Sequence, residues 1–419
     1  MSYKKWVNAE IDKAKASALS EKLNIDAFVA FLLVSRGIDD ELAASEFLSD
    51  GCRFSSPYLL KDMDKAVKRI NRALDDGESI CIYGDYDCDG VTSTALLYTF
   101  LSALGGFVSY YIPNRATDGY GMNFKAIDKI KADGTDLIIT VDNGISSIEE
   151  AEYIYSLGMQ LIVTDHHQIG ENLPRAEAVI NPHREDNEIE FRDFAGVGVA
   201  FKLACALYDG DVEDLLEDYA DYVTIGTIGD MVPLLNENRA IVKAGLKLIN
   251  TDAKIGISAL KKSTNSKAEH FSATDVAFQI CPRINAAGRM DTANLAVDLL
   301  TCEDNEIAEY KAEQLNLENT HRHEVEEKID KDIAEIMAND RAYQTDRVIV
   351  VAGHNYHKGV IGICAAHLVE LYSKPAIVIG IDDEGNATGS ARSIDGFNIF
   401  EAISSCSDIL THFGGHPLA

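Results

Sequence analysis

Short apolar runs alternate with helical patterns between residues 79 and 181, and this alternation limits the fold more strongly than any other feature. Strands are expected at 79–83, 107–112, 137–141, 160–164 and 177–180, with helices at 91–104, 123–132 and 146–157. Repeated strand–helix units of this length are typical of a parallel sheet that helices cover on both faces. The sequence therefore predicts an α/β fold for this region.

Helical patterns dominate the sequence on either side of this region. Residues 1–75 are expected to form an N-terminal helical region, with helices at 25–36 and 63–74. Residues 76–301 are expected to form one domain, in which the part at 197–301 is mainly helical. The predicted sheet would thus share its domain with a helical insert.

A long polar segment links this domain to a second α/β unit. Segment 302–345 carries apolar residues at helical spacing, which predicts a connector helix with one buried stripe. Strands at 347–352 and 376–381, with a helix between them, predict a partial second α/β domain over 346–419. We expect this C-terminal domain to be truncated, because the chain ends four residues after a Gly-Gly pair.

Carboxylates and imidazoles follow three of the predicted strands. They come after the runs at 79–83, 137–141 and 160–164, respectively, as Asp85, Asp87 and Asp89, then Asp142, then Asp165, His166 and His167. Because the carboxyl ends of parallel strands share one edge of a sheet, we expect these groups to lie close together. Acidic groups held that close repel one another and are costly to bury unless cations neutralise them. The sequence therefore predicts a metal site.

The kind of metal follows from the available donors. Asp230 adds a carboxylate at the end of a helix-like stretch, where the helix dipole disfavours an acid. Mostly oxygen donors with one or two imidazoles suit Mn²⁺ or Mg²⁺ better than zinc. The carboxylates exceed what one ion needs, so two divalent ions about 4 Å apart are expected. Two such ions can clamp a phosphate, which predicts phosphoester hydrolysis.

Other interpretations of the acidic stretches are weaker. The pattern Asp85-x-Asp87-x-Asp89-Gly90 also opens an EF-hand calcium loop, but Leu96 stands where that loop needs Glu, and no helix precedes it. An Asp-rich turn that caps the next helix explains only one of the three carboxylates. An Asn-Gly turn remains the alternative for Asp142.

The composition is that of an ordinary globular protein. The chain has 419 residues, 46% hydrophobic and 25% charged, which is enough for two or three domains. It begins without the apolar core of a secretory signal and contains no Cys-x-x-Cys, so we expect a reducing cytoplasm and no membrane span. The net charge of −30 disfavours nonspecific duplex binding but leaves room for a local basic groove.

At these residues the sequence resembles the DHH phosphoesterase superfamily, which is named for the triplet present here as Asp165-His166-His167. Within it, the similarity is to exonucleases that degrade single-stranded DNA from the 5′ end. The matching segments follow the family's order over nearly the whole chain: 82–93, 111–115, 196–202, 282–289, 389–393 and 413–416. The resemblance implies a parallel-sheet DHH domain with a helical insert, a long connecting helix and a partial DHH-associated α/β domain.

The resemblance also implies roles for the residues near the strand ends. Two Mn²⁺ or Mg²⁺ ions would be held by five residues, with Asp142 between the ions: Asp87, Asp89, Asp142, His166 and Asp230. Asp85 lies nearby, as a ligand or a support. Asp165 would orient His166, and His167 would face the scissile phosphate and stabilise developing charge.

Further residues are implied to bind the substrate. Arg115, Ser390 and Arg392 would hold a terminal 5′-phosphate, for which Arg offers a bidentate fork. His416, with Gly414 and Gly415, would close over the substrate. The residue pattern itself, with Arg283 and Arg289 flanking Asn285 in an apolar stretch, leads us to expect that these three line the strand channel, with bracing of domains as the alternative.

The implied activity is that of a 5′→3′ exonuclease for single-stranded DNA, acting in repair and recombination. A single-strand-binding protein and a helicase are the protein partners expected, and the chain is expected to be a monomer. The alternatives are a DHH phosphodiesterase for short oligonucleotides or cyclic dinucleotides, and a non-catalytic replication or repair scaffold. The sequence departs from the family at Pro417 and at His367, where Arg is common, and we expect it to lack the oligonucleotide-binding barrel that follows in the family.

Overall fold

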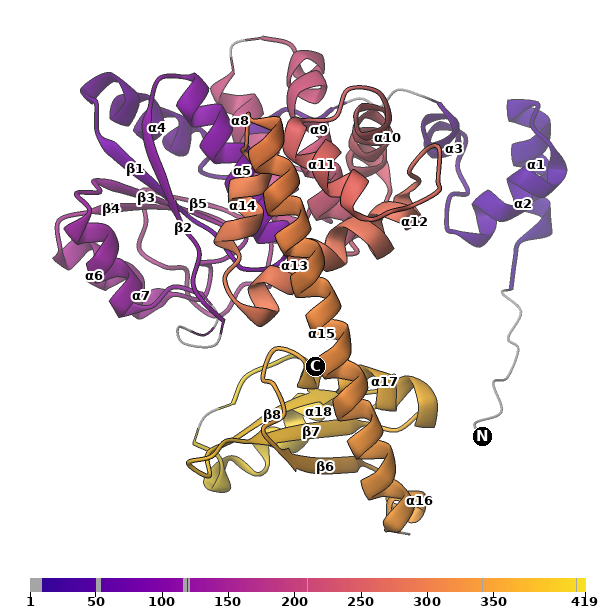
Figure 1. Cartoon of the computed structure of the whole chain (residues 1–419). Coiled ribbons are helices and arrows are strands. Elements are labelled where there is room, and N and C mark those ends of the chain that lie inside the picture. Colours follow the sequence, from indigo (N-terminus) through magenta and orange to yellow (C-terminus); the bar gives the residue numbers. More distant parts are fainter. Residues whose placement is uncertain are drawn as a thin grey trace. The chain divides into compact units, whose positions relative to one another are not determined.

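The computed structural model of the chain divides into two compact units, Asn8–Asn316 and a C-terminal unit that contains Leu317–Ala419 (Figure 1). The structure describes residues 10–49, 54–115, 119, 121–208, 210–340, 342–411 and 413–419. Within these residues, no helix is both long and apolar enough to cross a membrane.

A five-stranded parallel sheet organises the first unit, as the apolar runs predict. Its strands are arranged in the order β2-β1-β3-β4-β5. Their bounds lie within one residue of the predicted ones: β1 (Ser79–Tyr83), β2 (Phe107–Tyr111), β3 (Leu137–Val141), β4 (Gln160–Thr164) and β5 (Ala178–Ile180). The register pairs Ile80 with Leu137 and Leu137 with Gln160, so β1, β3 and β4 end side by side.

Helices cover both faces of this sheet (Figure 1). One face, with Ile80, Ile82 and Ile139, packs in a single core with α4 (Met63–Asp76), α5 (Cys88–Ala103) and α8 (Gly196–Leu207). The other face, with Ile138 and Leu161, packs against α6 (Phe124–Ala132) and α7 (Ile148–Ser156). Successive strand residues point to opposite faces of the sheet. A strand that is apolar along its length is therefore expected where helices pack on both faces.

The helical part of the first unit shares the core of the sheet. It contains α9 (Val212–Gly229), α10 (Asn236–Thr251), α11 (Ile255–Ser263), α12 (Ala273–Asp275), the π-helical turn η2 (Val276–Ile280), α13 (Cys281–Met290) and α14 (Asn294–Leu300). Buried side chains of α9, α13 and α14 belong to the same apolar cluster as α5 and α8. This continuity brings α8, α9 and α13 to the carboxyl edge of the sheet.

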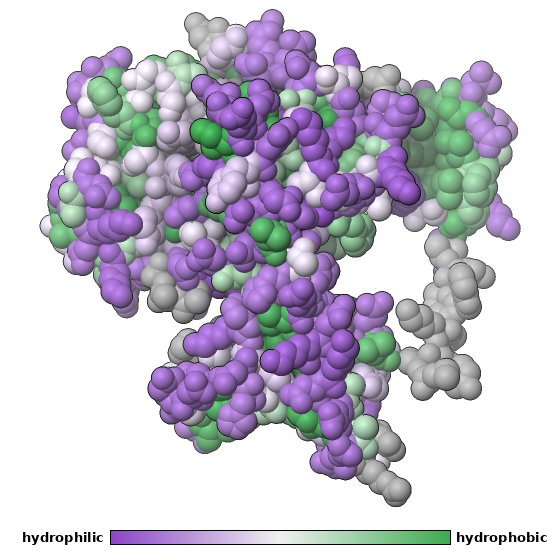
Figure 2. All heavy atoms as spheres, viewed as in Figure 1, coloured by the Kyte–Doolittle hydropathy of each residue, from purple (hydrophilic) through white to green (hydrophobic). Residues whose placement is uncertain are grey.

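The N-terminal helices have a small core of their own. The helices α1 (Lys13–Leu23), α2 (Ala27–Ser35) and α3 (Glu41–Leu48) bury Leu19, Ala30, Leu33, Ile38 and Ala44 together, and the short η1 (Pro57–Leu59) follows. Apolar side chains remain exposed on this part of the surface (Figure 2). They include Phe28, 66% exposed, and Leu42, 70% exposed.

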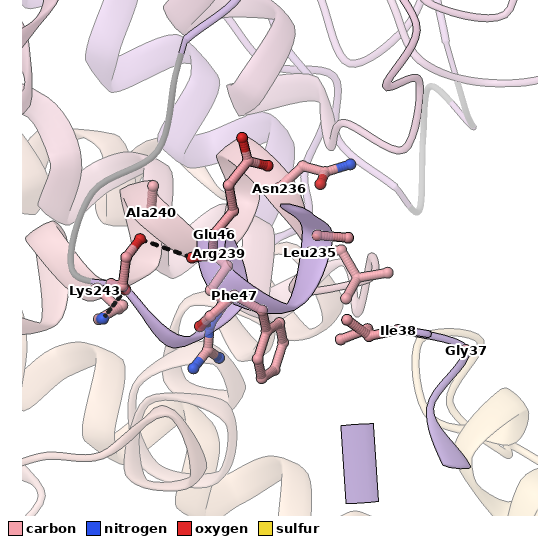
Figure 3. A pocket seen from close by; sticks show the side chains of 11 residues that line it. Gly37, Ile38, Glu46, Phe47, Leu235, Asn236, Arg239, Ala240 and Lys243 are labelled. Atoms are coloured by element: carbon pink, nitrogen blue, oxygen red, sulfur yellow. Dashed lines mark hydrogen bonds between the residues drawn. The ribbon is translucent and has the colours of Figure 1, made fainter. Parts of the chain in front are cut away.

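A cavity of about 180 Å³ lies between α3 and α10 and is lined by residues of both helices (Figure 3). The guanidinium of Arg239 lies 3.8 Å from the centre of the Phe47 ring, and its Nε donates to Phe47 O at 3.0 Å. Lys243 Nζ donates to Ser49 O at 2.8 Å. These two cations, one helical turn apart, attach the N-terminal helices to α10.

The C-terminal unit contains a three-stranded sheet. Most of the long helix α15 (Asn305–Asn339) belongs to it, followed by α16 (Ala342–Thr345), β6 (Ile349–His354), α17 (Ile361–Tyr372), β7 (Ala376–Ile381), β8 (Ala387–Arg392), α18 (Ile399–Ser404) and η3 (Ser407–Ile409). The strand order is β6-β7-β8, with β6 and β7 parallel and β8 antiparallel to β7. Ile329 and Ile333 of α15 are buried, as a one-sided stripe predicts.

Candidate metal centre

The carboxyl edge of the large sheet gathers the acidic residues that the sequence singled out. Asp85 follows β1, Asp142 follows β3 and Asp165 follows β4, and these strands are neighbours in the sheet. All three side chains are at most 3% exposed. The expectation that the strand ends bring these groups together is therefore confirmed by the geometry.

The acidic loop between β1 and α5 is tightly folded. Asp87 is the N-cap of α5, and its Oδ1 accepts hydrogen bonds from the backbone N–H groups of Asp89, at 2.9 Å, and Gly90, at 3.1 Å. A Cβ at Gly90 would lie 2.5 Å from Asp85 O, so only glycine fits there. Asp87 thus caps the helix, and one of its ligand atoms also lies within 4.8 Å of ligand atoms of Asp85 and Asp142.

Asp89 is held by the N-terminus of α8. Its Oδ2 accepts from Gly196 N at 2.6 Å and its Oδ1 from Val197 N at 2.8 Å. A helix N-terminus favours a negative charge, so these bonds orient a carboxylate that is only 1% exposed. The sequence analysis included Gly196-Val197-Gly198 only as part of the family match. Glycines at the start of a predicted helix were the one sequence feature that could have indicated a contact between its N-terminus and Asp89.

Asp142 stands at the centre of the cluster in a strained conformation. Its φ of 60° lies in the left-handed region, which Asp and Asn tolerate better than most side chains. A Cβ at Gly196 would lie 2.6 Å from Asp142 Cβ, so α8 packs directly against it. Next to it, Asn143 donates to Tyr83 O at 3.2 Å and to Val141 O at 2.9 Å, which joins the ends of β1 and β3. The sequence interpretation missed this role of Asn143.

His166 faces three carboxylates from three different elements. Its Nε2 lies 3.1 Å from Asp142 Oδ1, 3.8 Å from Asp89 Oδ2 and 3.8 Å from Asp230 Oδ2. Asp230 is the residue that ends α9, as the sequence pattern predicts. Four potential ligands thus converge from β3, β4, α5 and α9.

Asp165 orients the ring of His167, not that of His166, which corrects one expectation. Asp165 Oδ1 lies 2.7 Å from His167 Nδ1, and Asp165 Oδ2 accepts from Ile145 N at 2.9 Å. Asp165 meets His166 only at the backbone N–H, at 2.7 Å. The adjacent imidazoles leave β4 in different directions, so the carboxylate that precedes them can reach only the second ring.

Burial and mutual repulsion perturb the acids of this centre. They raise the pKa of Asp85 to about 8 and that of Asp230 to about 7. The pKa values of Asp89 and Asp142 are raised well above the ordinary range by the same two causes. Each group is harder to ionise because its neighbours are acids too, so bound cations would relieve the repulsion.

The two imidazoles are shifted in opposite directions. Burial lowers the pKa of His166 to about 4, with a further contribution from His167. Burial also opposes the charging of His167, but its bond to Asp165 prevails and raises the pKa of His167 to about 9. One ring is thus suited to donate a lone pair and the other to carry positive charge.

The donor set fits divalent cations. Two buried carboxylate oxygens, Asp85 Oδ1 and Asp142 Oδ1, accept no hydrogen bond from any described residue, although His166 Nε2 lies 3.1 Å from the second. Such orphaned oxygens are costly unless a cation satisfies them. Ligand atoms of three sets approach within 4.8 Å of one another: Asp85, Asp87 and Asp142; Asp89, His166 and Asp230; Asp142, His166 and His167.

Four residues that were expected to contact substrate also lie in this unit. The Arg115 guanidinium lies 5.1 Å from the centre of the Tyr86 ring, beside the acidic loop. On α13, Asn285 Oδ1 accepts from Cys88 N at 2.8 Å, and a Cβ at Gly288 would lie 2.2 Å from Tyr86 O. Arg283 donates to Asn316 Oδ1 at 3.1 Å and to Gln279 O at 2.6 Å. Arg289 is in the last turn of α13.

The remaining predicted residues belong to the C-terminal unit. Ser390 and Arg392 are on β8, and Arg392 Nη1 lies 3.3 Å from Ser390 Oγ. A Cβ at Gly362, in the first turn of α17, would lie 2.9 Å from Ser390 Oγ and 3.1 Å from Arg392 Nη2. His416 is exposed, and its N–H donates to Ala419 O at 2.7 Å, next to Gly414 and Gly415. The sequence pattern did not single out Gly362 as a neighbour of Ser390 and Arg392.

Replacing Asn285 by Ala is expected to weaken divalent-metal binding about tenfold, because supporting hydrogen bonds of this kind hold ligand loops in place. The amide oxygen bonds the backbone between Asp87 and Asp89, so its loss frees the acidic loop. Calorimetric titration with Mn²⁺ measures the change. Asn294→Ala, at an exposed site on α14, is the control and should bind as the unaltered protein does. Equal affinity in both variants would contradict this role.

Comparison with known proteins agrees with the fold. Residues 79–227 match the DHH family, N-terminal domain, and residues 345–419 match the DHHA1 domain. The architecture is therefore that of the DHH class of proteins. The single-stranded-DNA-specific exonuclease RecJ of Bacillus subtilis is 43% identical over 417 residues, which are 99% of this chain and 52% of that protein.

Further relatives carry the same name. RecJ of Escherichia coli is 36% identical over 379 residues, 86% of this chain and 66% of that protein. A crystal structure of exonuclease RecJ bound to manganese has a TM-score of 0.75 and 33% identity, covering 87% of this chain and 90% of that one. RecJ from Thermus thermophilus in complex with Mn²⁺ has a TM-score of 0.82 and 30% identity, covering 98% of this chain and 58% of that one.

The chain belongs to the RecJ family. It spans about half the length of the Bacillus relative, 52%.

Proposed function

We propose that this chain is a metal-dependent exonuclease that hydrolyses single-stranded DNA from a 5′-phosphate end, in DNA repair and recombination. The observation that carries the proposal is the buried Asp142 carboxylate, which four other acids surround and whose Oδ1 has His166 Nε2 at 3.1 Å but no hydrogen bond from the described residues. A cation is the natural partner for such a group. Relatives named single-stranded-DNA-specific exonucleases, and RecJ structures that hold manganese, support the substrate and the metal.

Two divalent ions, Mn²⁺ or Mg²⁺, would be held by Asp87, Asp89, Asp142, His166 and Asp230, with Asp85 beside them. When bound, such ions polarise a phosphate and lower the pKa of an attacking water. The protein's own contribution is rigidity. Asp89 is held by α8, Asp142 by close packing against Gly196, and the acidic loop by the cap of α5. Ligands that are already in place need not reorganise when the ions bind.

His167 is the residue of this chain that would act on the scissile phosphate. Its Nδ1 lies 2.7 Å from Asp165 Oδ1, which stabilises the imidazolium form and fixes the orientation of the ring. The other ring nitrogen, Nε2, is then positioned to donate a hydrogen bond to a phosphate oxygen. A fixed donor of this kind stabilises the negative charge that develops during phosphodiester cleavage.

Ser390, Arg392 and Gly362 would bind the terminal 5′-phosphate. The Ser390 hydroxyl and the Arg392 guanidinium lie next to each other on β8. Because Gly362 has no side chain, space remains beside both groups. The first turn of the twelve-residue helix α17 adds a partial positive charge. An exonuclease that starts at one end must recognise that end, and a terminal phosphate differs from an internal one by its extra charge. We propose separately, from the family resemblance, that Arg115, beside Tyr86 in the first unit, binds the 5′-phosphate.

Digestion of end-labelled strands tests the function directly. With Mn²⁺, a strand labelled at its 5′ end should release labelled mononucleotide first, whereas 3′ label should stay on long products. First release of the 3′ label would refute the proposed polarity. Strong preference for dinucleotides would favour a phosphodiesterase of short oligonucleotides, and absence of both cleavage and Mn²⁺ binding would favour a scaffold.

We propose that the chain acts in the cytoplasm as a monomer, with a single-strand-binding protein and a helicase as partners. The proposed domains are 1–75, 76–301, the connector 302–345 and 346–419. The cysteines that the structure describes are all free thiols, which suits a reducing compartment. Light scattering of the purified chain measures its oligomeric state.

A further inference from the structure

A second group of potential metal ligands lies in the C-terminal unit, on two helices. Glu326 and Asp330 are on α15, and His367 is on α17. The two acids are four residues apart, so they share one face of α15, one turn from each other. One ligand atom from each of the three residues lies within 4.8 Å of the other two. A single ion could therefore contact all three.

The imidazole engages the two acids through different nitrogens. His367 Nδ1 lies 2.9 Å from Asp330 Oδ2, which is a hydrogen-bond distance. His367 Nε2 lies 3.4 Å from Glu326 Oε1, which is longer than a normal hydrogen bond. An ion that binds one ring nitrogen of His367 and one oxygen of each acid would take the place of these direct contacts.

Neighbouring groups fix both carboxylates in orientation. Arg322 Nη1 holds Glu326 Oε2 at 2.6 Å, so Oε1 is the oxygen turned toward His367. Cys364, one turn before His367 on α17, is fully buried beside Asp330.

A cavity of about 320 Å³ opens beside the same residues. Asp330 and His367 contribute to its wall, with Ile333, Met337 and Leu371. It has room for water molecules, which complete the coordination of ions that have few protein ligands. Solvent can therefore reach Asp330 and His367 through this cavity.

We propose that Glu326, Asp330 and His367 bind one divalent ion of the zinc class, with water completing its coordination. One imidazole and two carboxylates suit Zn²⁺, which binds nitrogen and oxygen donors in four-coordinate sites. The ion would crosslink α15 to α17, and its role would be to stabilise the C-terminal unit. This site is independent of the proposed nuclease function, because none of its residues belongs to the acidic edge of the large sheet.

A protonated His367 paired with both acids is the competing explanation, and His367→Arg separates the two. Arginine keeps the positive charge between Glu326 and Asp330 but cannot ligate a cation. A simple ion pair therefore survives this substitution, whereas a zinc site does not.

Equilibrium dialysis of the full chain against Zn²⁺ counts the bound ions. We expect His367→Arg and Glu326→Gln each to bind one equivalent less than the unaltered protein, and His354→Gln, at an exposed position of β6, to bind the same number. Zinc bound elsewhere is common to all variants and cancels in the comparison. Equal stoichiometry in the unaltered protein and both site variants would overturn the proposal.

Thermal unfolding provides the second measurement. Zinc should raise the unfolding temperature of the unaltered protein by more than that of His367→Arg, because only the former has the crosslink. An equal shift would overturn the stabilising role. If His367→Arg fails to fold, Glu326→Gln replaces it in both experiments. Manganese-dependent cleavage of single-stranded DNA should be the same in all variants, so failure of this proposal is distinguishable from failure of the proposed function.

Discussion

Replacing Asp142 by Asn should lower cleavage of single-stranded DNA about a thousandfold, with loss of Mn²⁺ binding, because the carboxylate at the centre of the ligand cluster is removed. Asn keeps the shape of the side chain and tolerates the φ of 60° at this position. The same change removes one of several mutually repelling buried charges, which include Asp85, Asp87 and Asp89. The metal-free variant should therefore unfold with a free energy about 1 kcal/mol higher than that of the unaltered protein.

Three measurements on the same preparation test this expectation: calorimetric titration with Mn²⁺, digestion of a 5′-labelled strand, and thermal unfolding in a chelator. Asp75→Asn removes an exposed carboxylate at the end of α4 and should leave all three unchanged. Full Mn²⁺ affinity in Asp142→Asn would contradict the assignment of this residue. A large loss of stability in the metal-free variant would show that the carboxylate is structural.

Replacing Arg392 by Ala should reduce the preference for 5′-phosphorylated over 5′-hydroxyl strands about tenfold to a hundredfold, as expected for the loss of a charge-assisted hydrogen bond. The preference, and not the rate on hydroxyl ends, is the quantity that should change, because only a terminal phosphate presents the extra charge. Competition between the two kinds of strand in one reaction measures the ratio.

Gly362→Ala is the matched second variant for this site. Its new Cβ would lie 2.9 Å from Ser390 Oγ and 3.1 Å from Arg392 Nη2. It should therefore reduce the space for a phosphate beside these two groups, and with it the preference for 5′-phosphorylated strands, without removing a charge. Arg347→Ala, an exposed cation of the C-terminal unit, is the control and should keep the preference. If Arg392→Ala slows cleavage of both kinds of strand equally, the residue does not recognise the end.

The fold of the large sheet could be predicted because its signals are local. Five apolar runs of strand length alternate with helical patterns, and acidic residues follow the carboxyl ends of three of these runs. Parallel strands then bring Asp85, Asp142 and Asp165 to one edge as a matter of topology. The choice of oxygen-binding divalent ions followed from the types of residue alone.

The contacts that hold this site in place could not be predicted in the same way. Asp89 bonds to Gly196 and Val197, which are more than a hundred residues later in the chain, and Cys88 bonds to Asn285, which is later still. The sequence contains no periodic pattern that pairs such distant segments. Asp165 was paired with the wrong imidazole for a related reason, since the rotamers of adjacent side chains depend on what packs around them.

The sequence by itself determined the α/β class, the position of the acids after their strands and the kind of ion they suit. Each of these depends on residue type and on regularities within one element. The tertiary structure alone decided which helix N-terminus holds Asp89, which ring Asp165 bonds and how Glu326, Asp330 and His367 come together. Each of these depends on the packing of elements that are distant in sequence, where a shift of one ångström makes or breaks a contact.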